Sequence, residues 1–170
     1  MVVPLFKVFM SHDALDRVTP VLMSGKLTQG SQVEKYENVL SEYLGNSRVL
    51  TLNSATAGLT LALKMCDLGP DDVVLTPALT CFATTSAILA NNLKLRWIDV
   101  DPRTSNVDLD DLKSKLSPHT KVIVVVHWGG NPVDLDKLKE LQDYSLAKFG
   151  FRPQIIEDCA HAFGAEYGGK

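Results

Sequence analysis

The side chains best suited to chemistry lie in residues 157–161 (EDCAH), where two carboxylates end an apolar run. Acids at such a place cost free energy unless a neighbouring group needs their charge. A bound cofactor with a protonated ring nitrogen would need it, because a carboxylate paired with that nitrogen keeps the ring an effective electron sink. Capping of a following helix by Asp158 would explain the same residue without a ligand.

A second segment, residues 53–56 (NSAT), is small and hydroxyl-bearing and leads directly into an expected helix. Small side chains let a phosphate approach the free N–H groups at a helix N-terminus, where the helix dipole favours an anion. Plain N-capping by Ser54 or Thr56 is the alternative and, for this segment alone, the more frequent explanation.

Two further segments carry polar or reactive side chains after apolar runs. Residues 77–81 (PALTC) offer the hydroxyl of Thr80 and the thiol of Cys81, although a plain loop before a helix explains this segment better when it is taken alone. Residues 127–132 (HWGGNP) begin with His127, for which a structural role is slightly favoured over ligand contact. No dinucleotide-binding GxGxxG pattern and no P-loop pattern follows any expected strand, so those nucleotide sites lack their usual signature.

Strands that alternate with helices position these segments. Such alternation indicates a parallel sheet covered by helices on both faces, a three-layer α/β/α fold. In open sheets of this type, ligands bind beyond the carboxyl ends of the strands. The apolar patterns predict strands at 48–52, 73–75, 93–100, 122–126 and 154–157, and helices at 56–66, 82–90, 109–116 and 135–149.

The N-terminal part follows a different pattern. The first 30 residues are expected to be irregular, because Pro20 would interrupt a helix there. Residues 31–34 (SQVE) predict a capping box, and Gly45 is a natural helix end. The helix between them carries apolar residues at helical spacing, namely Val33, Tyr36, Leu40, Tyr43 and Leu44.

Composition narrows the class of protein. The chain has 170 residues, 45% of them hydrophobic and 22% charged, with a net charge of −3, as in an ordinary globular domain. This charge argues against a nucleic acid or an anionic membrane as partner, and no apolar run approaches the length of a membrane helix. Pro4 and Lys7 interrupt the apolar N-terminus, so we expect no signal peptide. Three cysteines without metal-type spacing predict no metal site and a reducing, cytoplasmic location.

Six segments in register resemble the DegT/DnrJ/EryC1/StrS family of pyridoxal-phosphate (PLP)-dependent sugar aminotransferases, from about Ser24 to the end of the chain. Each segment alone is a weak signal, but six in the same order are a strong one. The segments are 24–30 (SGKLTQG), 53–59 (NSATAGL), 76–80 (TPALT), 98–102 (IDVDP), 127–130 (HWGG) and 156–165 (IEDCAHAFGA).

The resemblance implies the fold of aspartate aminotransferase (fold type I) and transfer of an amino group, usually from glutamate, to a keto group of a nucleotide-linked sugar. It also implies a homodimer or larger assembly. By match of motif, the turn of Ser54, Ala55 and Thr56 would bind the cofactor phosphate. Asp158 would pair with the pyridine nitrogen, and His161 would lie near the phenolic oxygen.

The chain also departs from the family pattern. The residue after Thr80 is often an aromatic that stacks on the cofactor ring, and here it is Cys81. The Schiff-base lysine of the family would lie beyond residue 170, and Lys170 itself, in a glycine-rich turn, is not expected to replace it. We therefore expect an arm and loop over 1–30, an incomplete PLP-binding large domain over 31–170, no C-terminal small domain, and no activity of this chain by itself.

Two alternatives stay open. PLP-dependent deoxysugar dehydratases resemble the aminotransferases through this region and use a histidine in place of the lysine, at a position that this sequence does not reach. The other alternative is a non-catalytic fragment that binds a partner or a phosphate.

Overall fold

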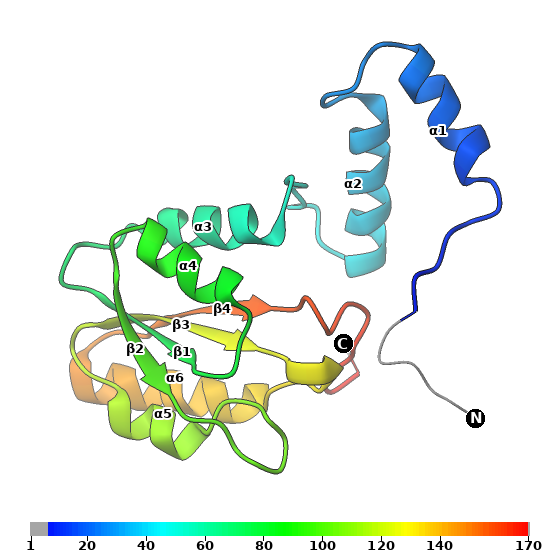
Figure 1. Cartoon of the computed structure of the whole chain (residues 1–170). Coiled ribbons are helices and arrows are strands. Elements are labelled where there is room, and N and C mark those ends of the chain that lie inside the picture. Colours follow the sequence, from blue (N-terminus) through cyan, green and yellow to red (C-terminus); the bar gives the residue numbers. More distant parts are fainter. Residues whose placement is uncertain (1–6, 170) are drawn as a thin grey trace. The chain divides into compact units, whose positions relative to one another are not determined.

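The computed structural model describes residues 7–169, so the expectations for Pro4 and Lys170 fall outside the described residues. The chain divides into two units, at residues 1–51 and 52–170 (Figure 1). Every candidate site residue belongs to the second unit.

The first unit contains two helices, α1 (Ala14–Met23) and α2 (Ser31–Leu44). The first 30 residues were predicted to be irregular, and this was wrong for α1, which contains Pro20. A proline removes only one backbone donor, and α1 ends within a turn of it. In the preceding turn the hydroxyl of Thr19 donates to the carbonyl oxygen of Leu15, at 2.7 Å.

The N-terminus of α2 also differs from its prediction. Ser31 is the first helical residue rather than the cap, and no capping box forms. The cap is Gly30, whose carbonyl oxygen accepts from the N–H groups of Val33 and Glu34 at 2.9 and 3.1 Å. Gly45 ends the helix in the left-handed conformation, as predicted.

Residues 48–52 form no strand, contrary to prediction. Side chains, rather than a neighbouring strand, take up backbone donors of this segment. The N–H and hydroxyl of Thr51 both donate to the carboxylate of Glu37, at 2.8 and 2.7 Å. The N–H of Arg48 donates to the side-chain oxygen of Asn46 at 2.9 Å. Val49, Leu50 and Leu52 are apolar, but hydrogen bonds to side chains take the place of a strand ladder in this segment.

A four-stranded sheet forms the centre of the second unit. It contains β1 (Val73–Pro77), β2 (Lys94–Ile98), β3 (Thr120–Val126) and β4 (Gln154–Asp158). The order is β2-β1-β3-β4, and every pairing is parallel. The predicted parallel sheet is therefore confirmed for these four strands.

Helices cover both faces of the sheet (Figure 1). One face packs against α3 (Ala55–Met65) and α4 (Phe82–Ala90), and the other against α5 (Leu109–Lys115) and α6 (Leu135–Phe149). Two buried clusters correspond to these faces, because successive strand residues point to opposite sides. The first cluster includes Leu63, Val74, Ile88, Val122 and Val124, and the second includes Leu75, Leu112, Ile123, Val125 and Leu138.

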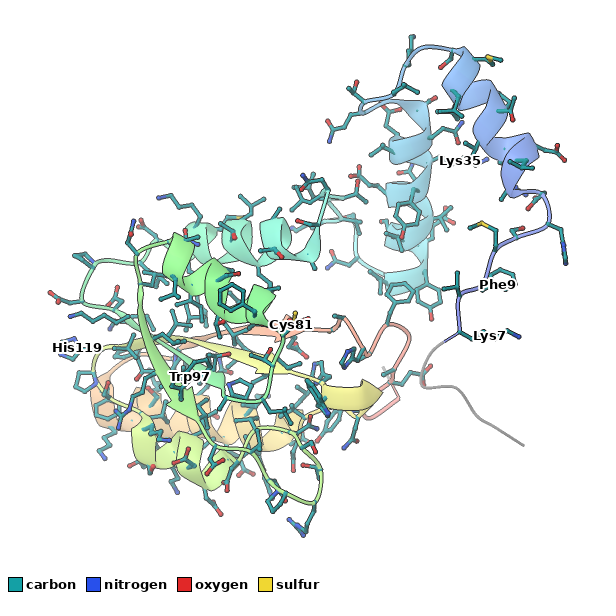
Figure 2. All side chains as sticks on the ribbon, viewed as in Figure 1. Lys7, Phe9, Lys35, Cys81, Trp97 and His119 are labelled. Carbon is teal, nitrogen blue, oxygen red and sulfur yellow. The ribbon has the colours of Figure 1, made fainter. Side chains whose placement is uncertain are left out.

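The carboxyl ends of the strands and the N-termini of α3 and α4 lie at the same end of this unit (Figure 1). Figure 2 shows Cys81, which precedes α4, at this end, and His119, which precedes β3, at the opposite end. The loop after β3 contains a short 3-10 turn, η1 (Trp128–Gly130). The fold therefore gathers the segments that follow the strands at one edge of the sheet.

We expect this 170-residue chain to self-associate through β4, which has a strand neighbour on only one side among the described residues. A groove with Leu138, Gln142 and Ile155 in its lining runs beside this edge, and exposed strand edges recruit other chains. Light scattering should show a dimer or larger. Gln154→Lys, which adds charge to the edge, should lower the apparent mass, and a monomer at high concentration would contradict the prediction.

Candidate functional site

Asp158 ends β4 with its carboxylate on the face covered by α3 and α4, the same side as Ile156. The hydroxyl of Thr84 donates to its Oδ2, and the N–H of Ala160 to its Oδ1, each at 3.1 Å. A carboxylate oxygen can accept more than one hydrogen bond, so both oxygens keep capacity for a cationic partner. Within the described residues no helix follows β4, so Asp158 does not cap one.

Thr80 and Cys81 lie at the start of α4. The Thr80 hydroxyl lies 2.7 Å from that of Thr84, so Thr80 is connected to Asp158 through Thr84. Cys81 is the N-cap residue of α4, but its side chain makes no capping bond and is exposed (Figure 2). The two neighbours therefore differ. The Thr80 hydroxyl is hydrogen-bonded to Thr84, whereas the Cys81 thiol is exposed to solvent.

The turn at Ser54 caps a helix and also leaves backbone N–H groups that could bind an anion. Ser54 caps α3, because its Oγ accepts from the N–H of Ala57 at 3.2 Å. Ala55 and Thr56 are exposed within the part of the chain that the structure describes. The first N–H groups of a helix have no partner within the helix, so those of Ala55 and Thr56 suit an anion such as a phosphate.

His161 lies in the loop after β4 and contacts the loop after β3. Its Nδ1 accepts from the N–H of Gly129 at 3.2 Å, and its ring makes a T-shaped contact with that of Trp128, with 5.3 Å between the ring centroids. Because Nδ1 is an acceptor, a neutral ring carries its proton on Nε2. His161 can therefore donate from Nε2 to an oxygen of a bound group.

His127 and Glu157 form a separate pair on the other face of the sheet. The Nε2 of buried His127 lies 2.9 Å from Oε2 of Glu157, and its Nδ1 accepts from the N–H of Val133 at 3.0 Å. Both ring nitrogens are used inside the protein, which agrees with the structural role favoured from the sequence. The hydrogen bond from His127 lowers the pKa of Glu157.

Two influences on the protonation of His127 oppose each other. The hydrogen bonds of Cys159 and Glu157 raise the pKa of His127 to about 9. A second ring proton would break the bond from the Val133 N–H, and that bond is buried. An unsatisfied buried donor is costly, so the Val133 bond favours a neutral His127 ring with its proton on Nε2.

Of the predicted site residues, the structure joins Thr80 and Asp158 through Thr84, a residue that the sequence prediction did not include. Spacing alone does not indicate this link, because Thr80 lies in the loop before α4 and only Thr84 lies within the helix. The remaining predicted residues lie at the same end of the unit without direct hydrogen bonds to Asp158 among the described contacts. They are Ser54, Ala55, Thr56, Cys81 and His161.

Residues 9–170 match the DegT/DnrJ/EryC1/StrS aminotransferase family. The chain belongs to this family. The match confirms the resemblance found in the sequence, and it covers both units of the structure.

Solved structures agree in fold. The chain is 50% identical to the sugar aminotransferase CalS13 from Micromonospora echinospora, with a TM-score of 0.92 over 99% of this chain and 46% of that one. For AtS13 from Actinomadura melliaura the identity is 52% and the TM-score 0.93, over 97% and 44% of the two chains. For the PLP-form of Spr1654 from Streptococcus pneumoniae the values are 30% and 0.90, over 99% and 45%.

These matches confirm the α/β fold as part of the fold type I large domain. The chain spans less than half the length of each of these three relatives. Among the described residues, no group of three His, Cys, Asp or Glu side chains could hold a metal ion. No helix in that part of the chain is long and apolar enough to cross a membrane.

We predict that Gly130→Ala destabilises the protein more than Gly129→Ala. Both glycines have positive φ, which costs an alanine about 1–2 kcal/mol. A Cβ at Gly130 would also lie 3.0 Å from the carbonyl oxygen of His161, whereas a Cβ at Gly129 would meet nothing within 4 Å. Urea unfolding measures the difference, and equal losses in the two variants would show that the loops do not constrain each other.

Proposed function

We propose that this chain forms the cofactor-binding part of a PLP-dependent aminotransferase that acts on a sugar. The observation that carries the proposal is the Asp158 carboxylate, held at the carboxyl end of β4 by Thr84 and Ala160 with capacity for a cationic partner. A pyridinium nitrogen is such a partner. Membership of the aminotransferase family and the PLP-form of Spr1654 support the choice of cofactor.

The residues of the site fit PLP by the chemistry of their donors. The exposed N–H groups of Ala55 and Thr56, beside the Ser54 cap, would hold the phosphate. Asp158 would keep the ring nitrogen protonated, and when bound the ring supplies an electron sink. His161 would donate from Nε2 to the phenolic oxygen, since Gly129 occupies its Nδ1.

Thr80 and Cys81 would lie beside the cofactor ring. The Thr80 hydroxyl is engaged with Thr84 and would act on the ring through Asp158. Cys81 would replace the aromatic stacking partner frequent in the family with an exposed thiol, which offers a soft, polarizable contact instead of a flat surface.

We further propose a nucleotide-linked keto sugar as acceptor, glutamate as amino donor, and a homodimer or larger assembly in the cytoplasm. CalS13 is a sugar aminotransferase, and half of its aligned residues are identical to this chain. This identity favours an aminotransferase over the related sugar dehydratases. We propose no role for nucleic acid or a membrane.

In an enzyme that joins this chain to the family's lysine-bearing segment, Asp158→Asn should lower the transamination rate on the order of 10³-fold. An amide does not stabilise the charge of a pyridinium nitrogen, so the electron sink fails. Steady-state assays with glutamate and a keto sugar nucleotide measure the loss, and circular dichroism checks the fold. Near-normal transamination by a folded variant would refute the assignment of Asp158.

We also propose that the 170-residue chain by itself is catalytically inert, because the family's lysine would lie beyond residue 170 and nucleophilic catalysis needs that amine. Borohydride treatment after addition of PLP should attach no cofactor to a single lysine, as mass spectrometry of the tryptic peptides would show. Stoichiometric labelling of one lysine would contradict the prediction.

A further inference from the structure

Thr84 is the one buried side chain from the helical layers that a described hydrogen bond joins to Asp158. It lies in the first turn of α4 and is 1% exposed. Its hydroxyl donates to Oδ2 of Asp158 at 3.1 Å, across 74 residues of sequence, and lies 2.7 Å from the Thr80 hydroxyl. A hydroxyl held between a second hydroxyl and a carboxylate has little freedom.

The direction of these bonds follows from the chemistry of the three groups. An ionised carboxylate only accepts, and a threonine hydroxyl has one proton. The proton of Thr84 therefore points at Asp158, and the proton of Thr80 points at Thr84. Hydrogen bonds in such a chain polarise one another, so Thr80 strengthens the bond that Thr84 makes to the carboxylate.

The bond from Thr84 also restricts rotation of the carboxylate. The torsion that turns an aspartate carboxylate has a broad, shallow profile, and the Ala160 N–H holds only Oδ1. Thr84 holds Oδ2 from a different layer of the fold. Ala87 and Ile88 pack the same helix into the buried cluster of that face, so the packing of α4 fixes the plane of the Asp158 carboxylate.

We propose that Thr84 is a positioning residue, which orients the Asp158 carboxylate toward the ring nitrogen of PLP, and that Thr80 orients Thr84. This inference rests on the proposed function. It also gives the Thr80 hydroxyl a role, which is to act on the cofactor through Thr84 and Asp158.

The test is a titration of the protein with PLP that carries nitrogen-15 in its ring, and it reads the dissociation constant and the chemical shift of the bound ring nitrogen. Thr84→Val keeps the branched shape and removes the hydroxyl. We expect the dissociation constant to rise about 10-fold, the effect of losing one hydrogen bond to a charged group, and the shift to move toward the unprotonated ring. Thr84→Ser retains the hydroxyl and should restore both toward wild type.

Thr85→Val is the matched control. Thr85 is also buried in α4, but its hydroxyl donates to the carbonyl oxygen of Phe82 at 3.1 Å. This variant loses a buried hydroxyl from the same helix and should leave both the affinity and the shift unchanged. A Thr84→Val protein with the wild-type shift, or a Thr85→Val protein that moves as far as Thr84→Val, would overturn the inference.

Asp158→Asn separates this inference from the proposed function. If wild-type protein binds no PLP, or if Asp158→Asn changes neither the affinity nor the shift, the proposed function fails and the role of Thr84 fails with it. If Asp158→Asn changes both while Thr84→Val changes neither, the site stands and only the role of Thr84 is wrong.

Discussion

The two-sided burial of β3 is the constraint on which the second unit depends. Its residues 122–126 are apolar, β-branched and buried on alternate faces, so both helical layers must pack against this one strand. Parallel pairing with β1 and β4 on its two edges then aligns the ends of the strands. A chain in which β3 lost either cover would expose a continuous apolar strip to water.

The same alternation solves the problem of two consecutive acids at the end of β4. Glu157 and Asp158 point to opposite faces of the sheet. Their carboxylates therefore have different partners and do not face each other. Glu157 is matched by the buried His127, a fixed internal pair. Among the described contacts, Asp158 receives two neutral donors, a hydroxyl and a backbone N–H, and its charge remains available for a ligand.

This division connects the fold to the proposed chemistry. A cofactor that must be held by phosphate and ring nitrogen together needs an anion site and a carboxylate on one side of the sheet. The start of α3 and the end of β4 lie at the same end of the second unit (Figure 1). The family to which the chain belongs consists of aminotransferases. Helix α4 packs against the same face and contributes the Thr84 hydroxyl that donates to the Asp158 carboxylate.

The sequence by itself determined the parallel α/β fold, the family and the place of Asp158, because β-branched runs, caps and motif order are local patterns. The sequence wrongly predicted a strand at 48–52, where the N–H of Thr51 donates to Glu37 instead of to a neighbouring strand. It also did not predict the hydrogen bond from Thr84 to Asp158. Only the tertiary structure decided these points. Each depends on which donor comes within about 3 Å of a carboxylate from a distant part of the chain, and packing and register fix such distances, not residue type.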